Sequence, residues 1–281
     1  VGSEMCIRDS YERGLKLPDD ITLVWPDDNF GYIKKLNTKK ESLRKGGSGV
    51  YYHISYLGEP HDYLWLNTTP PALMYEEMSK AYSTGADTYW LLNVGDIKPG
   101  ELGMKTFLDM AWDYDSFNYE NINNHQVDFL TSVFGEKYRS RLSDIMSSYY
   151  KLGFQRKPEA MGWGYEWNSS KSTERITDTD FSFTNYREAE NRMAEYDRIS
   201  DIAEKIWKEL PEEYKASFYE LVFYPVKGAA LMNKKMLTAQ QNRWFARQGR
   251  SAANEYAEKT QAYHDSIGSV SYTHLRAHET S

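Results

Sequence analysis

The order of apolar runs along the chain constrains its fold most. Three short runs rich in β-branched or aromatic residues are ITLVW at 21–25, VYYHISY at 50–56 and TYWLLNVG at 88–95. Runs of this length, bounded by Gly, Pro or Asp, are typical of strands. The first and third are almost continuously apolar, which predicts strands buried on both faces, as in a parallel sheet.

Helices are expected between these strands. Thr69 and Pro70 have the form of an N-cap followed by proline at the first helical position, and Gly85 is expected to end that helix. A second helix is expected after Pro99, over residues 101–112. The alternation of strand and helix predicts an α/β architecture with parallel strands.

From about residue 120 the pattern changes to helix alone. Apolar residues over 199–210 follow the spacing of a helix with one buried face. A new helix is expected at Pro211, with a kink or break at Pro225, which has no amide donor. The polar stretch 167–184 has no helical period and is interpreted as a long loop. The expected fold class is therefore α/β followed by all-α, with the boundary within 114–123.

Both ends of the sequence look foreign to the rest. VGSEMCIRDS at the start and VSYTHLRAHETS at the end resemble translated sequencing-adapter read-through, which recurs in assembled metagenomic genes. Residues 1–10 and 269–281 are therefore set aside as artefact-like and not native. The single cysteine, Cys6, lies in the first of these segments. The remaining chain offers no disulfide or cysteine metal site, so cysteine usage does not indicate a redox compartment.

Composition narrows the classes of partner. The formal net charge is −7 and no sustained basic stripe occurs, which argues against nucleic acid. No apolar run approaches the length of a membrane span. Aromatic residues make up 15% of the chain, with 23 Tyr and 8 Trp. Such richness suits sugar binding by ring stacking, but it suits large cores and interfaces equally well.

Polar residues follow all three predicted strands. Because parallel strands end at the same edge of a sheet, and active sites of α/β barrels lie at that edge, these residues are expected to meet at one accessible rim. The candidates are Asp27, Asp28 and Asn29 after the first strand, His53, Tyr56, His61 and Tyr63 at and after the second, and Asn93 at the third.

Structural roles are open alternatives at these positions. Asp-Asp-Asn before Phe-Gly is also good turn chemistry, and a single strand histidine is most often hydrogen-bonded structure. Asn93 interrupts an apolar strand, so its amide either bonds a neighbour or faces a ligand. No phosphate-binding glycine loop or nucleophile elbow occurs. His53, His61 and His125 lack metal-ligand spacing, and neither a metal nor a cofactor is expected.

Several long motifs resemble one known family. PDDITLVWPDDNFGYIKKLN, GGSGVYYHISYLGEPHDYLWLNTTPPALMYEEMSKAY, LLNVGDIKPGELGMKTFLDMAWD and FYELVFYPVKGAALMNK occur in the order found in glycoside hydrolase family 115. The similarity runs from about Tyr11 to about Ile267. Members are α-glucuronidases that remove glucuronic acid, or its 4-O-methyl form, from the O2 of xylose in xylan with inversion.

The resemblance implies a larger, multi-domain parent. It has an N-terminal α/β domain, a (β/α)8-type catalytic barrel, a helical bundle and a C-terminal β-sandwich. Residues 11–118 would be the last part of the barrel and residues 119–268 the helical bundle. The resemblance implies a periplasmic or secreted parent, although the chain itself shows no localisation signal. Whether the parent is a homo-oligomer stays open.

The resemblance also suggests roles for the strand-end residues. Family pocket residues match Asn29, His53, Tyr56 and Asn93, which would hold xylan or a glucuronoxylo-oligosaccharide. Asp27 and Asp28 are the weaker candidates for catalysis, and His61 and Tyr63 extend the expected binding set.

One departure from the family concerns catalysis. A family carboxylate proposed for catalysis precedes the matching segment, where adapter-like residues stand here, and Glu4 is not its equivalent. The chain is therefore expected to be an inactive fragment. A non-catalytic glycan-binding module and a helical interaction scaffold are the alternatives.

Overall fold

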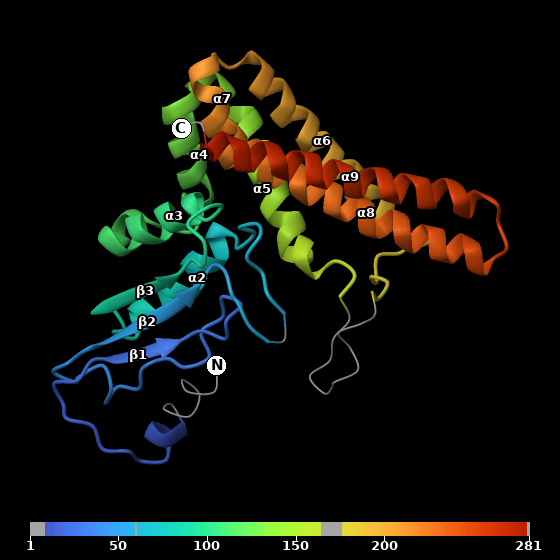
Figure 1. Ribbon diagram of the computed structural model, residues 1–281. Helices are drawn as coiled ribbons and strands as arrows, with labels where there is room; N and C mark the ends of the chain where they lie inside the picture. The colour runs from blue at the N-terminus through green and yellow to red at the C-terminus, as the bar shows by residue number, and fades with distance from the viewer. Residues whose placement is uncertain (1–8, 60, 164–175, 280–281) are drawn as a thin grey trace. The chain divides into compact units, whose positions relative to one another are not determined.

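The computed structural model describes residues 9–59, 61–163 and 176–279 (Figure 1). The chain divides into two compact units, Val1–Asn123 and Asn124–Ser281, called here the sheet unit and the helical unit. Glu4 and Cys6 lie outside the described residues.

The sheet unit contains a three-stranded parallel sheet. Its strands are β1 Leu23–Pro26, β2 Ser48–His53 and β3 Tyr89–Asn93, in the order β1-β2-β3. Both neighbouring pairs are parallel, with Trp25 opposite Val50 and Val50 opposite Trp90. The predicted α/β arrangement with parallel strands is confirmed, although each strand is shorter than its apolar run.

One face of this sheet is covered by helices. α2 spans Pro71–Ser83 and α3 spans Glu101–Trp112 (Figure 1). Their apolar side chains form a core with the same face of the strands; fully buried members are Val50, Tyr52, Met74, Met78, Phe107 and Met110. The apolar stripes of two helices therefore bury alternate residues of each strand.

The other face is largely uncovered by the described residues. Val24 is 38% exposed, and Tyr89 and Leu91 are 49% and 41% exposed. Strand register places these residues on one face together with Tyr51. The prediction that β1 and β3 are buried on both faces is therefore wrong for this chain. Apolar composition indicated the strands correctly, but it could not show whether a second layer lies within the same chain.

The ends of α2 illustrate local sequence signals. Pro70 is the N-cap and Pro71 the first helical residue, so the prediction of Thr69 as N-cap was one residue too early. Two successive prolines have nearly the same φ, and either suits the first turn. At the other end Gly85 adopts φ +81°, and its N–H donates to the Tyr82 carbonyl at 2.9 Å. The predicted glycine stop is confirmed.

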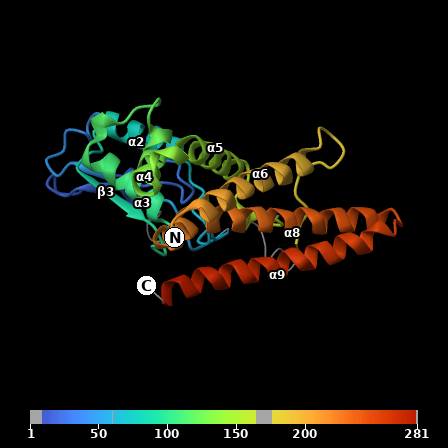
Figure 2. The same ribbon diagram turned by 90° about the horizontal axis from the view of Figure 1, so that it is seen from above.

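The second half of the chain is helical, as predicted. Its α-helices are α4 Ile122–Phe134, α5 Arg139–Gln155, α6 Glu188–Glu209, α7 Glu212–Phe218, α8 Tyr224–Arg247 and α9 Ala252–Glu279. Short 3-10 helices are Tyr114–Ser116, Glu136–Tyr138 and Pro158–Ala160. α8 and α9 lie side by side as a long antiparallel pair (Figures 1 and 2).

The helical unit buries the predicted apolar stripe. Ile199, Ala203 and Ile206 of α6 are fully buried, as their spacing indicates. Residues 176–184 form neither helix nor strand, in line with the predicted loop, whereas 167–175 lie outside the described residues. Residues 269–279, set aside from the sequence, continue α9.

Of the kink or break predicted at Pro225, the break does not occur. A π-helix, Tyr219–Phe223, connects α7 to α8 without interruption. Proline removes one helical hydrogen bond and its ring crowds the preceding turn, and a wider π turn relieves both conflicts. Among the described helices, none is long and apolar enough to cross a membrane.

Candidate active site

The carboxyl ends of the three strands bring most of the predicted residues together. β2 and β3 run in register, so that His53 lies directly opposite Asn93. Asp27 follows the last residue of β1, and its side chain reaches His53. Side chains from three segments separated in sequence therefore meet at one edge of the sheet.

A tight turn follows β1. Asp28 Oδ1 accepts the backbone N–H groups of Phe30 and Tyr32 at 3.0 and 3.1 Å, and Asp28 Oδ2 lies 3.2 Å from Lys34 Nζ. The turn closes with an antiparallel bridge between Asp27 and Ile33. Both oxygens of Asp28 thus hold the turn, which is the structural alternative recognised in the sequence.

The turn rests on a buried tyrosine. Tyr52 donates its hydroxyl hydrogen bond to the Gly31 carbonyl at 3.1 Å. Gly31 adopts φ +91°, and a Cβ there would lie 2.9 Å from Tyr52 Oη, which favours glycine. Burial raises the pKa of Tyr52 well above its usual value, with the Asp27 carboxylate adding to the shift. The phenol therefore stays a neutral donor at physiological pH.

Asn29 occupies an unusual backbone conformation in this turn. Its φ is +70°, a region that asparagine enters more readily than most residues. Its N–H donates to Asp27 Oδ1 at 2.8 Å, and its carbonyl accepts from the Tyr63 hydroxyl at 2.5 Å. Among the described residues no group bonds its side-chain amide, which leaves that amide available to a ligand.

Asp27 and His53 form a buried pair. Asp27 Oδ1 lies 2.6 Å from His53 Nδ1, and Oδ2 accepts the His53 backbone N–H at 2.9 Å. A carboxylate at Nδ1 favours the proton on that nitrogen and leaves Nε2 as the nitrogen that faces other partners. Asp27 thus fixes both the position and the tautomer of the imidazole.

Burial of this pair corrects one expectation. His53 is 3% exposed and Asp27 is 7% exposed, so His53 is not the solvent-accessible rim residue predicted from its place at the strand end. Tyr51 packs over its ring, with centroids 4.5 Å apart, and Tyr56 meets it edge-on at 5.9 Å. These two rings cover the imidazole.

The amide of Asn93 is paired. Its Nδ2 donates to Tyr51 Oη at 2.7 Å, and its Oδ1 accepts the Gly95 N–H at 3.2 Å. Tyr51 therefore links His53 with Asn93. Sequence reasoning missed Tyr51, although it precedes His53 by two residues and so shares its face of the strand.

Tyr56 and Tyr63 close the loop that follows β2. They form an antiparallel bridge, and their side chains are 5% and 2% exposed. The ring of Phe30 packs against both, at 6.0 and 5.4 Å. His61 lies half-buried in the loop between them. Tyr56 thus contacts His53 and Tyr63 contacts Asn29, whereas Asn29, His61 and Asn93 keep partial exposure.

The chemistry of this edge favours binding and orientation. It offers an amide, an imidazole nitrogen and tyrosine rings, while its two carboxylates, Asp27 and Asp28, are engaged by His53 and by the turn. Within the described residues, no group of three or more His, Cys, Asp or Glu side chains has the geometry to hold a metal ion.

Comparisons with known proteins identify the family of the chain. The model of glycosyl hydrolase family 115 matches residues 5–160. A solved structure, BtGH115A, is described as a family GH115 4-O-methyl-α-glucuronidase with specificity for decorated arabinogalactans. The chain aligns with it at 39% identity and a TM-score of 0.86, over 95% of this chain and 34% of that one. The chain thus spans about a third of that relative's length. No curated protein matches the chain.

Proposed function

Because the chain belongs to glycoside hydrolase family 115, we propose that its strand-end residues hold the uronic acid of a decorated polysaccharide in an α-glucuronidase active site. The observation that carries this proposal is the Asp27–His53 pair beside Asn29. Family membership supports a glycosidase with a carbohydrate substrate. The uronate, the linkage and the roles of individual residues belong to the proposal.

His53 is the proposed partner of the uronate carboxylate. When the ring carries a proton on each nitrogen, Nδ1–H donates to the Asp27 carboxylate and Nε2–H donates to an oxygen of the uronate. The amide of Asn29, held in place through its backbone by Asp27 and Tyr63, bonds a sugar hydroxyl. Fixing a substrate in one orientation contributes to rate as well as to affinity.

Neither carboxylate of this edge is the proposed catalytic acid or base. An inverting glycosidase needs two carboxyl groups roughly 6.5–9.5 Å apart, one to protonate the leaving oxygen and one to activate water. Asp27 is committed to His53 and Asp28 to the turn. We therefore assign Asp27 a positioning role and expect the catalytic pair to come from residues outside this chain, as the family resemblance implies.

A barrel wall is the proposed context of the sheet unit. Helices cover one face of the parallel sheet, and the other face carries Tyr51, His53 and Asn93 with partly exposed Tyr89 and Leu91. In a (β/α)8 barrel the helices lie outside and the opposite face lines the interior. Residues 11–118 would form part of such a wall, and residues 119–268 a helical bundle.

Two polysaccharides are candidate substrates. The sequence resemblance favours α-1,2-linked glucuronic acid, or its 4-O-methyl form, on xylan. The relative BtGH115A is described as specific for decorated arabinogalactans. The proposed contacts are made to the uronic acid alone, so they are compatible with both substrates. Residues outside the strand-end site must then distinguish the main chains of the two polysaccharides.

A chimera tests the proposed function. This chain would replace the matching third of BtGH115A, and release of 4-O-methyl-glucuronic acid would be followed on glucuronoxylan and on a decorated arabinogalactan. We expect activity on at least one of them. A folded chimera without activity, beside an active parent, would contradict the proposal that this chain supplies a working part of the site.

The chain alone provides the complementary measurement. We expect the soluble 281-residue chain to release no uronic acid, because loss of a general acid alone removes roughly 10²–10⁴-fold in rate. Activity within about tenfold of BtGH115A, a barrier difference of roughly 1.4 kcal/mol, would show that the acid and base lie inside the chain. Asp27 and Asp28 would then be the leading candidates.

A further inference from the structure

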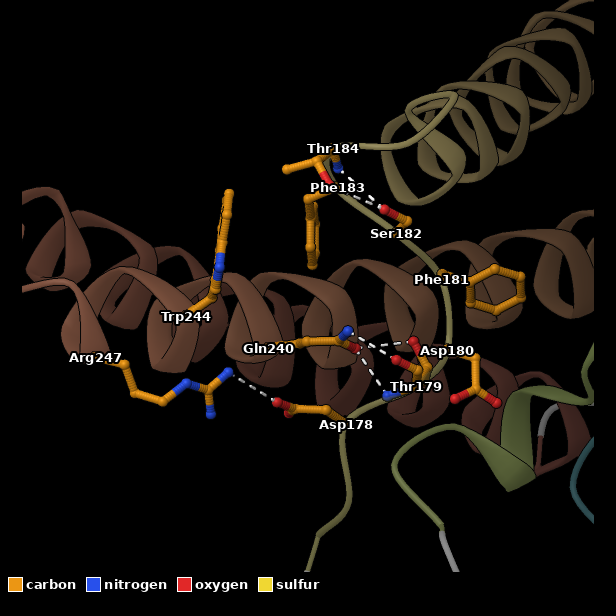
Figure 3. Close-up of a pocket in the computed structure, with 10 residues that line it drawn as sticks. All are labelled: Asp178, Thr179, Asp180, Phe181, Ser182, Phe183, Thr184, Gln240, Trp244 and Arg247. Atoms are coloured by element: carbon orange, nitrogen blue, oxygen red, sulfur yellow. Dashed lines mark hydrogen bonds and ion pairs between the residues drawn. The ribbon is translucent and has the colours of Figure 1, made fainter.

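A pocket in the helical unit lies apart from the strand-end residues in sequence and chemistry. It is formed between the segment Asp178–Thr184 and the C-terminal half of α8 (Figure 3). Its volume is about 310 Å³, at the lower end of the range of small-molecule sites. A pocket of this size accommodates one or two sugar residues.

The floor of the pocket is rigid. Gln240 Oε1 accepts the N–H and the hydroxyl of Thr179 at 2.9 and 2.8 Å, and Gln240 Nε2 donates to the Thr179 carbonyl at 2.9 Å (Figure 3). Asp178 accepts from Arg243 Nε at 2.8 Å. These contacts hold the segment on α8, so the pocket is formed before any ligand arrives.

Two aromatic rings form one wall. Phe183 and Trp244 are nearly parallel, with an interplanar angle of 12° and centroids 6.1 Å apart (Figure 3). Phe183 packs against the buried cluster around Met236 and Leu237, whereas Trp244 remains outside that cluster and partly exposed. The supported indole presents an apolar surface to the pocket, as a sugar-stacking ring requires.

The polar groups at the pocket balance each other in charge. Asp178 and Asp180 are opposed by Arg243 and Arg247, and Arg247 reaches Asp178 at 3.5 Å while its side chain stays 63% exposed. Among the described residues no cation pairs with Asp180, so its carboxylate is free to accept hydrogen bonds.

This balance points to a neutral ligand with hydroxyl groups. Sugar hydroxyls donate to carboxylates and accept from guanidinium groups, so a short glycan that spans the pocket uses Asp180 with one hydroxyl and Arg247 with another (Figure 3). The C–H face of one of its rings covers the indole of Trp244. An anionic sugar would meet the uncompensated carboxylate of Asp180 and is disfavoured.

We propose that this pocket is a second carbohydrate site, which binds a neutral glycosyl unit by stacking on Trp244 and by hydrogen bonds to Asp180 and Arg247. The choice of a polysaccharide main chain as the source of that unit rests on the proposed function. The binding chemistry itself rests on the pocket alone. Such a site would select the main chain of the polymer, which the uronate contacts do not address.

Binding to the intact chain tests the proposal without any turnover. Xylohexaose and a β-1,3-linked galactohexaose would be titrated by calorimetry, with tryptophan fluorescence as the second readout and glucuronic acid as the charged comparison. We expect a Kd of about 0.1–1 mM for at least one neutral probe, typical of a small ligand with few contacts. Glucuronic acid, whose proposed site is at the strand ends, is expected not to displace that neutral probe.

Variants locate the site. Trp244→Ala and Asp180→Ala are each expected to weaken binding at least about tenfold, equivalent to roughly 1.4 kcal/mol. Trp112→Ala is the matched control, because Trp112 is 92% exposed and belongs to the sheet unit. Trp244→Phe retains a ring and is expected to restore part of the affinity.

The outcomes separate this proposal from its alternatives. If the rings only lock the segment on α8, Trp244→Ala lowers the Tm and the folded wild-type chain binds neither probe at about 10 mM, weaker than any useful affinity. Equal binding by Asp180→Ala and wild type would also overturn the assignment. Asp180 is exposed, so this variant decides the question even if Trp244→Ala fails to fold. Inactivity of the chimera would leave a positive binding result intact.

Discussion

The two units bury polar groups in different ways. In the sheet unit Asp27 and His53 are 26 residues apart, and their pair leaves Nε2 without a hydrogen bond among the described residues. In the helical unit Arg192, 4% exposed, donates to Asn233 Oδ1 at 2.8 Å, to the Leu152 carbonyl at 3.0 Å and to the Arg156 carbonyl at 2.9 Å. Every one of these acceptors is neutral.

The difference separates a structural network from a candidate site. Arg192 of α6 donates to carbonyls at the C-terminal end of α5, where a cation is favourable. Its guanidinium therefore serves to hold the two helices together. Burial lowers the pKa of its guanidinium, which nevertheless stays charged. In the strand-end network, by contrast, the His53 Nε2 and the Asn29 side-chain amide have no hydrogen-bond partner among the described residues. A polar group whose hydrogen bonds are not all made within the protein is therefore a better candidate for ligand binding than a group that is only buried.

Glycine substitutions give the largest contrast between the units. A Cβ at Gly49 would lie 1.6 Å from the Tyr89 carbonyl oxygen, so Gly49→Ala forces β2 and β3 apart. We expect a loss above about 4 kcal/mol, or failure of the sheet unit to fold. In α9 a Cβ at Gly268 meets no atom within 4 Å, and Gly268→Ala is expected to stabilise the helix by up to about 1 kcal/mol. Hydrogen exchange read by mass spectrometry reports each unit separately. Loss of protection confined to α9 in the first variant would contradict the assignment.

Replacing the buried arginine is expected to have the next largest effect. Arg192→Met removes hydrogen bonds to four acceptors, on Asn233, Leu152, Gln155 and Arg156, and should cost the helical unit about 3 kcal/mol in its free energy of unfolding. Arg198 provides the matched control, because its side chain is 42% exposed and pairs with Asp144 and Glu195 on the surface. Arg198→Met should cost less than about 1 kcal/mol. Equal losses in urea titrations followed by circular dichroism would show that burial does not separate the two networks.

The pH dependence of a surface pair is the smallest expected effect. The hydrogen bond from Arg198, together with that from Ser148, lowers the pKa of Glu195 to about 2 in the folded chain. A depressed carboxyl pKa contributes stability above its unfolded value, near 4.3, and that contribution fades as pH falls toward 2. The difference in stability between wild type and Glu195→Gln should therefore shrink between pH 5 and about pH 2 and stay below about 1 kcal/mol throughout. A difference that grows on acidification would have the wrong sign.

The sequence predicted those features of the fold that depend on residues close together in the chain. The three strands, the glycine stop of α2 and the buried stripe of α6 follow from residues within one turn or one strand of each other. The π turn before Pro225 was not predictable, because a helix can accommodate the missing backbone N–H of proline by breaking, by kinking or by widening to a π turn.

The candidate site was predictable only in part. Parallel strands ending at one edge gave the neighbourhood of His53 and Asn93. The Asp27–His53 pair, by contrast, depends on a turn whose geometry is set by Tyr52 and Tyr63 from other segments. The burial of His53 depends on the rings of Tyr51 and Tyr56 that pack around it. Neither feature is encoded within a single window of sequence.

The role proposed for the strand-end residues is tested most directly by the uronate affinity at His53. Two variants of His53 are compared in the chimera with BtGH115A. His53→Asn keeps an amide donor near Asp27 but has no atom in the place of Nε2. His53→Gln has a longer side chain, whose amide lies nearer to the place of Nε2. Inhibition by glucuronic acid, and the kcat and KM on the polymer, would be measured for both, with His264→Ala in α9 as an exposed control. We predict that His53→Asn folds and loses at least about tenfold in affinity for glucuronic acid, roughly 1.4 kcal/mol, that His53→Gln retains more, and that the control is unchanged. Unaltered glucuronic acid affinity in a folded His53→Asn chimera would contradict it and return His53 to a purely structural role.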